Sequence, residues 1–412
     1  MLSLPTDPQL LPLPNGNTLH LFPSDALDIL RLDFTFEAGA AYQQKKFCAV
    51  AANTLFPVAS AGRPFHEVAE FFDFRGIVVE PFVDTCTSAL TVYTLPRYVD
   101  DLLPLLQELL LQPSFPDDEF ESFARKTQAR LKSSFQKTRY VVRNLFFESL
   151  FGSEHPLGRY AVPEDIPLLT VDDVKAFHRQ HYHLSDAHLV MSGNYDDRIL
   201  KLYADHFAPV GDGPRKTPCS LAAPSPFVGE QKIRRAFPGA VQASICIGSV
   251  LPLSWDDPDY ARFIVLNTVL GGYFGSRLMS NLREDKGLTY GIYSQTHIYR
   301  GCIVFSIAAD VSSQSVQEAV DEIYNELRRL QEELVPNDEL EVVRHYMEGD
   351  YLRSIDGLFE RAERFRQMCS NFVSDQFSLN LFDAIQNVTP EHLQQLARRY
   401  FNPDLLVEAV VG

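Results

Sequence analysis

Apolar and polar residues alternate with two different periods along this chain, and the alternation predicts strands and helices in turn. In the C-terminal half, the pattern predicts strands at 241–250 (VQASICIGSV), 288–295 (LTYGIYSQ) and 301–310 (GCIVFSIAAD), with a helix at 258–270. A further helix is predicted after residue 315, because apolar residues recur there every three or four positions: Val316, Ala319, Val320, Ile323, Leu327, Leu330 and Leu334. Ser315 and Glu318 predict a capping box at its start.

The chain also repeats itself. FPDDEF at 115–120 returns as VPNDEL at 335–340, and each hexapeptide is predicted to begin a helix. Residues 170–193 return as residues 389–412. The two offsets are 220 and 219 residues, and their agreement indicates a tandem duplication.

The repeat sets the predicted domain organisation. The domains are 1–207 and 227–412, joined by a linker at 208–226 where Gly and Pro replace periodic apolar residues. Each copy is predicted to be an α+β domain, a mostly antiparallel sheet with helices packed on one face. Two such domains facing each other would enclose a chamber.

Composition and charge narrow the functional class. The chain has 412 residues, of which 45% are hydrophobic and 22% charged, as in ordinary globular proteins. Its formal net charge of −17 would repel phosphate backbones, so we predict no nucleic-acid partner. No apolar run approaches the roughly 20 residues of a membrane span, so we predict no membrane partner and a cytoplasmic location.

Cysteine usage gives a related expectation about the compartment. The six cysteines are widely scattered and mostly lie in apolar runs: Cys48, Cys86, Cys219, Cys246, Cys302 and Cys369. This distribution predicts buried free thiols in a reducing compartment.

Four stretches, taken in order, resemble the insulinase and pitrilysin zinc peptidases and their mitochondrial processing peptidase relatives. They are LPNGNTLHLFP at 13–23, FEAGAAYQ at 36–43, GSEHPLGRY at 152–160 and LGGYFGSRLMSNLREDKGLTYGIYS at 270–294. Their order and spacing together carry the resemblance, which covers nearly the whole chain.

Active members of that family carry His-x-x-Glu-His on a helix of the first domain. The spacing places both imidazoles on one helical face, where they bind zinc, and the Glu activates the metal's water. Here the five positions fall on Val50, Ala51, Ala52, Asn53 and Thr54, and the resemblance places a further ligand near Ala129 and Arg130. None of these side chains is an imidazole or a carboxylate, and an Arg would repel the cation. The chain therefore resembles the family's non-catalytic subunits, and we predict no metal on it.

The resemblance implies that Arg283 and Tyr290 act on the substrate. A turn at Gly287 could aim the guanidinium and the phenol at one spot, where they could hold the substrate backbone and an oxyanion. From residue types alone, an ion pair between Arg283 and a nearby carboxylate, with Tyr290 as half-buried strand filler, remains open.

Three other patterns carry weaker chemistry. The histidines of AFHRQHYH (176–183) have no counterparts in the second copy, which favours a surface histidine cluster over a metal site. HEVAE at 66–70 predicts a solvated helix face. GGYFGS at 271–276 predicts helix packing and a turn, because the Lys-Ser or Lys-Thr of a phosphate loop does not follow it.

Three functional hypotheses result. In the first, the chain is the zinc-less, non-catalytic subunit of a heterodimeric peptidase; it pairs with a homologous zinc-bearing subunit and helps to bind and cleave peptides. In the second, it is a non-enzymatic peptide-binding or scaffold protein of the same fold, formed as a homodimer by self-association. In the third, it is an unusual metallopeptidase that uses the histidines of 176–183. The first hypothesis is favoured, and it predicts no peptidase activity for the chain alone and zinc on the partner subunit.

Overall fold

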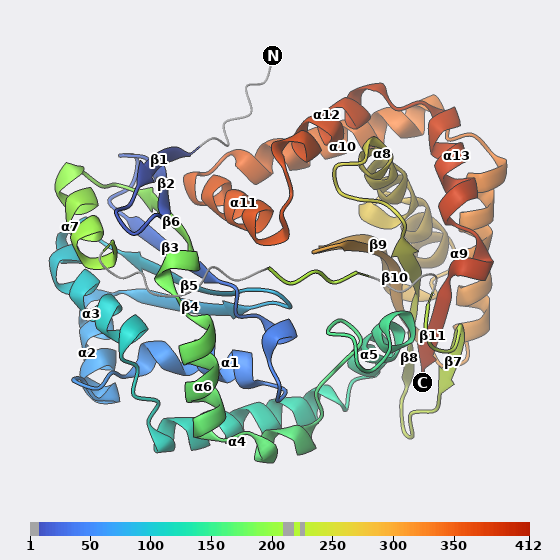
Figure 1. The fold of residues 1–412 in the computed structure, drawn as a ribbon. Helices are drawn as coiled ribbons and strands as arrows, with labels where there is room; N and C mark the ends of the chain where they lie inside the picture. The colour runs from blue at the N-terminus through green and yellow to red at the C-terminus, as the bar shows by residue number, and fades with distance from the viewer. Residues whose placement is uncertain (1–7, 209–217, 223–226) are drawn as a thin grey trace. The chain divides into compact units, whose positions relative to one another are not determined.

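The computed structural model describes residues 8–208, 218–222 and 227–412 (Figure 1). The predicted linker at 208–226 lies largely outside these residues. The described residues form two compact units. Unit 1 contains those among 1–131, 161–219 and 353–370, and unit 2 contains those among 132–160, 220–352 and 371–412. Each unit therefore includes a segment from the opposite half of the sequence.

Unit 1 is built on a six-stranded sheet with the order β1-β2-β6-β3-β5-β4. Neighbouring strands are antiparallel except β2 and β6, which are parallel. The strands are β1 (Gln9–Pro12), β2 (Thr18–Pro23), β3 (Leu30–Phe36), β4 (Val78–Val83), β5 (Ser88–Thr94) and β6 (His188–Gly193). The helices are α1 (Cys48–Leu55), α2 (Phe65–Arg75), α3 (Val99–Leu111), most of α4 (Asp117–Ser134), α6 (Val171–His181), α7 (Asp197–Phe207) and α11 (Leu358–Asn371). Side chains from α1, α3, α6 and α7 form the main core on one face of the sheet.

Unit 2 is built on a five-stranded sheet with the order β7-β11-β8-β10-β9. The strands are β7 (Lys232–Arg235), β8 (Gln242–Leu251), β9 (Thr289–Tyr299), β10 (Cys302–Ser312) and β11 (Val407–Val411). The helices are α5 (Thr138–Phe151), α8 (Pro258–Asn267), α9 (Val316–Glu332), most of α10 (Asn337–Ile355), α12 (Asp375–Asn387) and α13 (Pro390–Tyr400), with π-helical turns at Thr268–Gly272 and Met279–Asp285.

The two sheets share one topology. In unit 1 the strands β2, β6, β3, β5 and β4 follow each other as β7, β11, β8, β10 and β9 do in unit 2. In both sheets the first of these pairs is parallel and the others are antiparallel. The predicted fold, two similar α+β domains with mostly antiparallel sheets, is therefore confirmed.

In each unit, a helix also covers the second face of the sheet. In unit 2, α5 packs on β8 and β11 (Figure 1), with Phe146 and Leu150 in one cluster with Cys246 and Ala409. In unit 1, Ala362 of α11 packs in one cluster with residues of β2 and β6. The bounds of α5 and α11 differ by 220 residues at both ends, so they are the equivalent helices of the two copies. Each copy thus supplies the helix that covers the other copy's sheet.

The predicted elements of the C-terminal half are present, with their ends displaced by a few residues. β8, β9, β10 and α8 occupy the predicted stretches, and both repeated hexapeptides begin helices, α4 and α10. Two predictions about α9, the capping box at Ser315 and the place of Leu334 in its apolar stripe, are wrong. The Ser315 hydroxyl lies 3.0 Å from that of Ser312 and makes no capping bond to the helix. Leu334 lies beyond the end of α9 and is 47% exposed, so it is not part of the apolar stripe.

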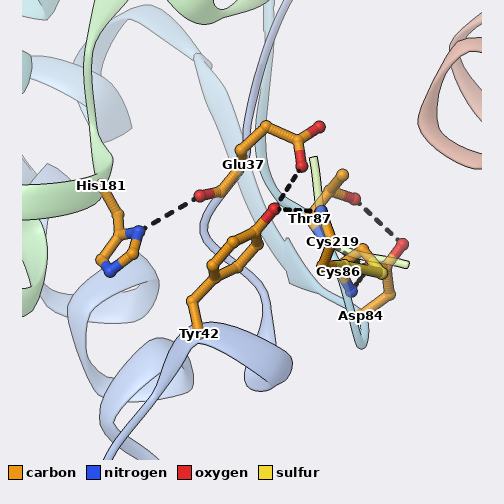
Figure 2. The surroundings of a disulfide bond; sticks show 7 residues. All are labelled: Glu37, Tyr42, Asp84, Cys86, Thr87, His181 and Cys219. Atoms are coloured by element: carbon orange, nitrogen blue, oxygen red, sulfur yellow. Dashed lines mark hydrogen bonds between the residues drawn. A yellow bond between two sulfur atoms is a disulfide. The ribbon is translucent and has the colours of Figure 1, made fainter. Parts of the chain in front are cut away.

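The prediction that all six cysteines are free thiols is wrong for two of them. Cys86 and Cys219 form a disulfide, although 133 residues separate them in sequence (Figure 2). Cys48, Cys246 and Cys302 are buried free thiols, and Cys369 is a half-buried one. The cysteine content therefore no longer supports a reducing compartment, and the cytoplasmic location stays a prediction. In the described ranges, no helix combines the length and apolar character that crossing a membrane requires.

Polar contacts hold both ends of the disulfide (Figure 2). Asp84, in the turn between β4 and β5, accepts hydrogen bonds from the backbone N of Cys86 at 2.7 Å and from the Thr87 hydroxyl at 2.9 Å. The Tyr42 hydroxyl accepts from the backbone N of Cys219 at 2.8 Å and donates to Glu37 at 2.7 Å. These contacts fix Cys219 against the β4–β5 turn of unit 1.

An ion-pair network fastens α11 to the sheet of unit 1. Arg31 on β3 is only 3% exposed; its Nε lies 2.8 Å from Asp33, and its Nη2 lies 2.6 Å from Glu363 on α11. Arg366, one turn further along α11, also contacts Glu363 at 2.5 Å. Partial burial opposes ionisation of Glu363, but hydrogen bonds from Arg366 and Arg31 outweigh it and lower the pKa of Glu363 to about 2.

We expect Glu363→Gln to lower the free energy of unfolding at pH 7 by about 2 kcal/mol, after allowance for solvent screening. Because the folded pKa lies below the unfolded value, this contribution is fully present above about pH 4.5 and is lost as the pH falls toward 2. Urea denaturation at several pH values measures it. Glu121→Gln, at an exposed position of α4, is the matched control. A Glu363→Gln deficit that stays constant from pH 7 to pH 3 would contradict the role of the charge.

Candidate functional site

The helix α1 carries three of the positions at which the family resemblance places zinc chemistry. Val50 and Thr54 are half-buried, and Asn53 is fully buried. The Asn53 amide nitrogen donates to the backbone carbonyls of Phe82 on β4, at 3.0 Å, and Ala89 on β5, at 2.9 Å. Its carbonyl oxygen accepts from the Tyr182 hydroxyl at 3.1 Å. Asn53 therefore joins α1 to two strands and to the residue that follows α6.

These residues do not fit a zinc ion. The amide nitrogen of Asn53 is a donor and cannot ligate, and its oxygen is occupied by Tyr182. Val50 has no ligating atom, and Thr54 offers a neutral hydroxyl, which is a poor zinc ligand. Arg130 lies on an exposed part of α4 and would repel a cation. Across the described residues, no group of three or more His, Cys, Asp or Glu side chains is placed to hold a metal ion.

Thr54 lies at the wall of a mostly apolar cavity of about 350 Å³ within unit 1. Phe65, Phe72 and Val79 supply much of the remaining wall, and Asp73 is the acidic residue in the lining. An apolar wall with one carboxylate cannot supply the three or four ligands that a zinc site needs. The cavity wall beside Thr54 therefore offers too few ligands for zinc, and so do the side chains of α1 itself.

The histidines of 176–183 are not a surface cluster, which corrects that expectation. His178 and His181 are 5% and 7% exposed, on the inner side of α6. His178 stacks on Tyr182 at a centroid distance of 4.6 Å, and burial, with His183 and Arg179 nearby, lowers its pKa to about 3. The ring of His181 lies 3.3 Å from the backbone carbonyl of Glu37 (Figure 2). Both are core residues, whereas the 66–70 segment is exposed apart from Val68 and half-buried Ala69, as a solvated helix face should be.

Arg283 lies on the π-helical turn Met279–Asp285 of unit 2. Its guanidinium carbon is 4.6 Å from the centroid of the Phe274 ring, which is itself 59% exposed. No hydrogen bond or ion pair joins Arg283 to another residue in the described part of the chain. Its neighbours do have partners: Asn281 donates to Glu326 at 2.8 Å, and Lys286 lies 3.3 Å from Glu322. The turn is thus fixed by other residues, and Arg283 keeps its donors available.

Tyr290 lies near the start of the edge strand β9 and is 92% exposed. Thr289 pairs with Val311 and Ile292 pairs with Ala309, so Tyr290 and Gly291 together face Asp310 in a β-bulge. The Thr289 hydroxyl stabilises the bulge by donating to the Asp310 carbonyl at 2.7 Å. The bulge directs Tyr290 into solvent, and the open alternative of a half-buried strand residue does not describe this position.

The predicted turn at Gly287 is present, with φ of +64°, and the backbone N of Leu288 donates to the carbonyl of Leu282 at 2.8 Å. The turn therefore connects the elements that carry Arg283 and Tyr290, while no hydrogen bond in the described residues joins these two side chains. Sequence reasoning missed Phe274, which supports the guanidinium. The position of Phe274 within GGYFGS, nine residues before Arg283, could have indicated this contact, but the glycines of the segment indicate backbone packing instead. That packing role is real, because a Cβ at Gly271 would lie 2.7 Å from the backbone N of Ser294.

This chain is similar to proteins of a known peptidase family. Residues 168–347 match the family described as Peptidase M16 inactive domain. The protein named "Uncharacterized zinc protease YmxG" from Bacillus subtilis is 23% identical to this chain over 85% of it and 84% of its own length. The "Non-peptidase homolog YmxG" from Helicobacter pylori is 26% identical over 61% of this chain and 60% of its own length.

Solved structures show the same fold. A crystal structure of a peptidase M16 inactive domain from Pseudomonas fluorescens superimposes with a TM-score of 0.83 at 20% identity, covering 98% of both chains. A protease from Helicobacter pylori superimposes with a TM-score of 0.85 at 17% identity, covering 98% of this chain and 99% of its own. The predicted resemblance is therefore confirmed. The family match at residues 168–347 includes Arg283 and Tyr290 but not α1.

We expect Asn53→Asp to lower the free energy of unfolding at pH 7 by roughly 3 kcal/mol. The isosteric carboxylate loses both donors and places its oxygens against the carbonyls of Phe82 and Ala89. Thermal and urea unfolding measure the loss. Thr54→Val is the matched control, with an expected change below about 0.5 kcal/mol. Equal stability of Asn53→Asp and the unmodified chain would show that Asn53 is not a structural link.

Proposed function

We propose that this chain is the zinc-less subunit of a two-subunit M16 peptidase. It pairs with a homologous subunit that carries the zinc, and its own contribution is to bind the peptide and to stabilise the transition state. The observation that carries the proposal is that the side chains of Arg283 and Tyr290 form no hydrogen bond or ion pair with another described residue. Arg283 lies over the Phe274 ring and Tyr290 is 92% exposed, and both residues lie on elements fixed by a turn and a bulge within the residues that match the inactive-domain family.

The chemistry assigned to the pair is hydrogen-bond donation. The Tyr290 phenol and the Arg283 guanidinium donate to the substrate carbonyl and to the oxyanion that develops there, with strengths of about 3 kcal/mol per donor. Arg283 is pre-organised by Phe274, so less side-chain entropy is lost when a substrate binds. The residues at 50, 53 and 54 supply no metal ligand, which is why the proposal assigns the zinc to a partner.

A second candidate is a non-enzymatic peptide-binding or scaffold protein that forms a homodimer. The name of the Helicobacter pylori relative, "Non-peptidase homolog YmxG", favours it. The two candidates differ in what accompanies the chain in its native host. Purification of the tagged chain from that host, followed by mass spectrometry, recovers a similar-length chain with His-x-x-Glu-His under the first proposal. Recovery of the chain alone, or only with copies of itself, favours the second.

The isolated chain is expected to retain less than about 0.1 zinc per molecule, because it lacks ligands for the ion. It is also expected to leave peptides intact. Elemental analysis after dialysis and a peptide-digestion assay measure both properties. The zinc-bearing partner, treated in the same way, is the positive control. Stoichiometric zinc on the isolated chain, or cleavage by it, would refute the assignment of the metal to a partner.

In the mixed complex, Tyr290→Phe is expected to lower kcat by about 100- to 1,000-fold and to change KM by less than about threefold, since the lost donor acts mainly on the transition state. Steady-state kinetics with one fluorogenic peptide measure both constants. Tyr346→Phe, a partly exposed tyrosine on α10 that packs on Tyr273, is the matched control. An unchanged kcat in Tyr290→Phe would remove the proposed role while leaving the subunit pairing intact.

A further inference from the structure

Unit 2 contains a cavity of about 380 Å³ between α5 and the second face of its sheet. The helix contributes Arg139 and Arg143, β9 contributes Tyr293 and His297, and β10 contributes Asp310. Apolar side chains such as Phe147 form part of the wall. The cavity is separate from Arg283 and Tyr290, which are not among its lining residues.

The acidic group of this cavity is already neutralised. Asp310 accepts a hydrogen bond from the Ser244 hydroxyl at 2.5 Å, and its other oxygen lies 3.3 Å from the Nε of Arg139. The Ser244 hydroxyl in turn lies 2.8 Å from that of Thr138 at the start of α5. This small network leaves Asp310 and Arg139 paired.

Arg143 has no such partner. Its side chain is exposed at the cavity and its guanidinium carbon lies 5.4 Å from the centroid of Phe147. In the described part of the chain, no carboxylate or carbonyl forms an ion pair or hydrogen bond with it. Burial and the charge of Arg143 lower the pKa of His297, which therefore stays neutral at pH 7. The lining carries one positive charge in excess, in a protein whose formal net charge is −17.

The repeat shows what this position holds in unit 1. With the 220-residue offset of α5 and α11, Arg143 corresponds to Glu363. Glu363 is an ion-pair partner of a sheet arginine, Arg31, at 2.6 Å, and of Arg366 on its own helix. In unit 1 the guanidinium and the carboxylate both come from the chain. In unit 2 the helix presents a guanidinium, and the carboxylate is missing from the described residues.

We propose that this cavity binds the carboxylate of a peptide, with Arg143 as the charged donor and the side chains of Tyr293 and Gln295 beside it. The carboxylate is either a C-terminal α-carboxylate or an acidic side chain. A phosphate suits the cavity less well, because its additional charge would meet Asp310 in the wall. Tyr293 and Gln295 lie on β9, the edge strand of the sheet, along which an extended peptide can lie while its carboxylate enters the cavity.

The experiment uses the full chain alone and three fluorescein-labelled heptapeptides of Ala and Ser, measured by fluorescence anisotropy. The first has a free C-terminus, the second is amidated and contains one central Glu, and the third is amidated and uncharged. One or both carboxylate peptides should bind at least tenfold more tightly than the uncharged one, which corresponds to about 1.4 kcal/mol. The peptide that shows the preference identifies the source of the carboxylate. Neither a partner subunit nor peptidase activity enters the result, so failure here is distinct from failure of the subunit assignment.

Arg143→Gln should abolish the tenfold preference without changing the melting temperature, because the side chain is exposed and unpaired in the described residues. Arg143→Glu should reverse it in favour of the uncharged peptide. Arg125→Gln, at an exposed position of α4 in unit 1, is the matched control and should keep the preference. Equal binding of all three peptides, no binding of any at millimolar concentration, or a preference that survives Arg143→Gln would overturn the proposal.

Discussion

Both faces of each sheet carry apolar side chains, and burial of the second face depends on a helix from the other copy of the repeat. Phe22 and Val190 on the sheet of unit 1 pack in one cluster with Ala362 of α11, and the sheet of unit 2 is covered in the same way by α5. Burial of a large apolar side chain contributes about 1.5–3 kcal/mol, so an uncovered face would be costly. The main core of each unit comes from one half of the sequence, whereas the cluster on the second face of each sheet combines residues of both halves.

The two covering helices show how one fold element serves two purposes. In α11, Glu363 is held by two arginines and fastens the helix to its sheet. In α5, the corresponding Arg143 has no described partner, and the helix is held instead by apolar contacts around Phe146 and Leu150. A helix secured by apolar packing can leave a charged side chain available for a ligand.

The residues at which the resemblance places the family's chemistry differ in the same way: some make structural hydrogen bonds, and others have no hydrogen-bond partner in the described residues. Asn53, which the resemblance places at the position of the family's Glu, is buried and satisfies two strand carbonyls and a tyrosine hydroxyl. Arg283 and Tyr290 lie on elements that are fixed by their neighbours; Tyr290 is exposed, and Arg283 is half-buried with its guanidinium over the Phe274 ring. Structural hydrogen bonds thus occupy Asn53 on α1, whereas the two residues to which we assign substrate binding lie within the residues that match the inactive-domain family.

The sequence by itself determined the duplication, the α+β class and the main elements of the C-terminal half, and it shows that Val50, Asn53 and Thr54 carry neither an imidazole nor a carboxylate. These follow from periodicity, spacing and side-chain chemistry, which act over short distances along the chain. Only the tertiary structure decided which helix covers which sheet face, that Cys86 pairs with Cys219, that His178 and His181 are buried, and that Arg143 lines a cavity. The helix–sheet contacts, the disulfide and the cavity join segments about a hundred residues or more apart, and no local pattern encodes such contacts. His178 and His181 do continue the apolar stripe of Val174 and Phe177 on α6, but the structure was needed to show that this stripe takes the imidazoles into the core.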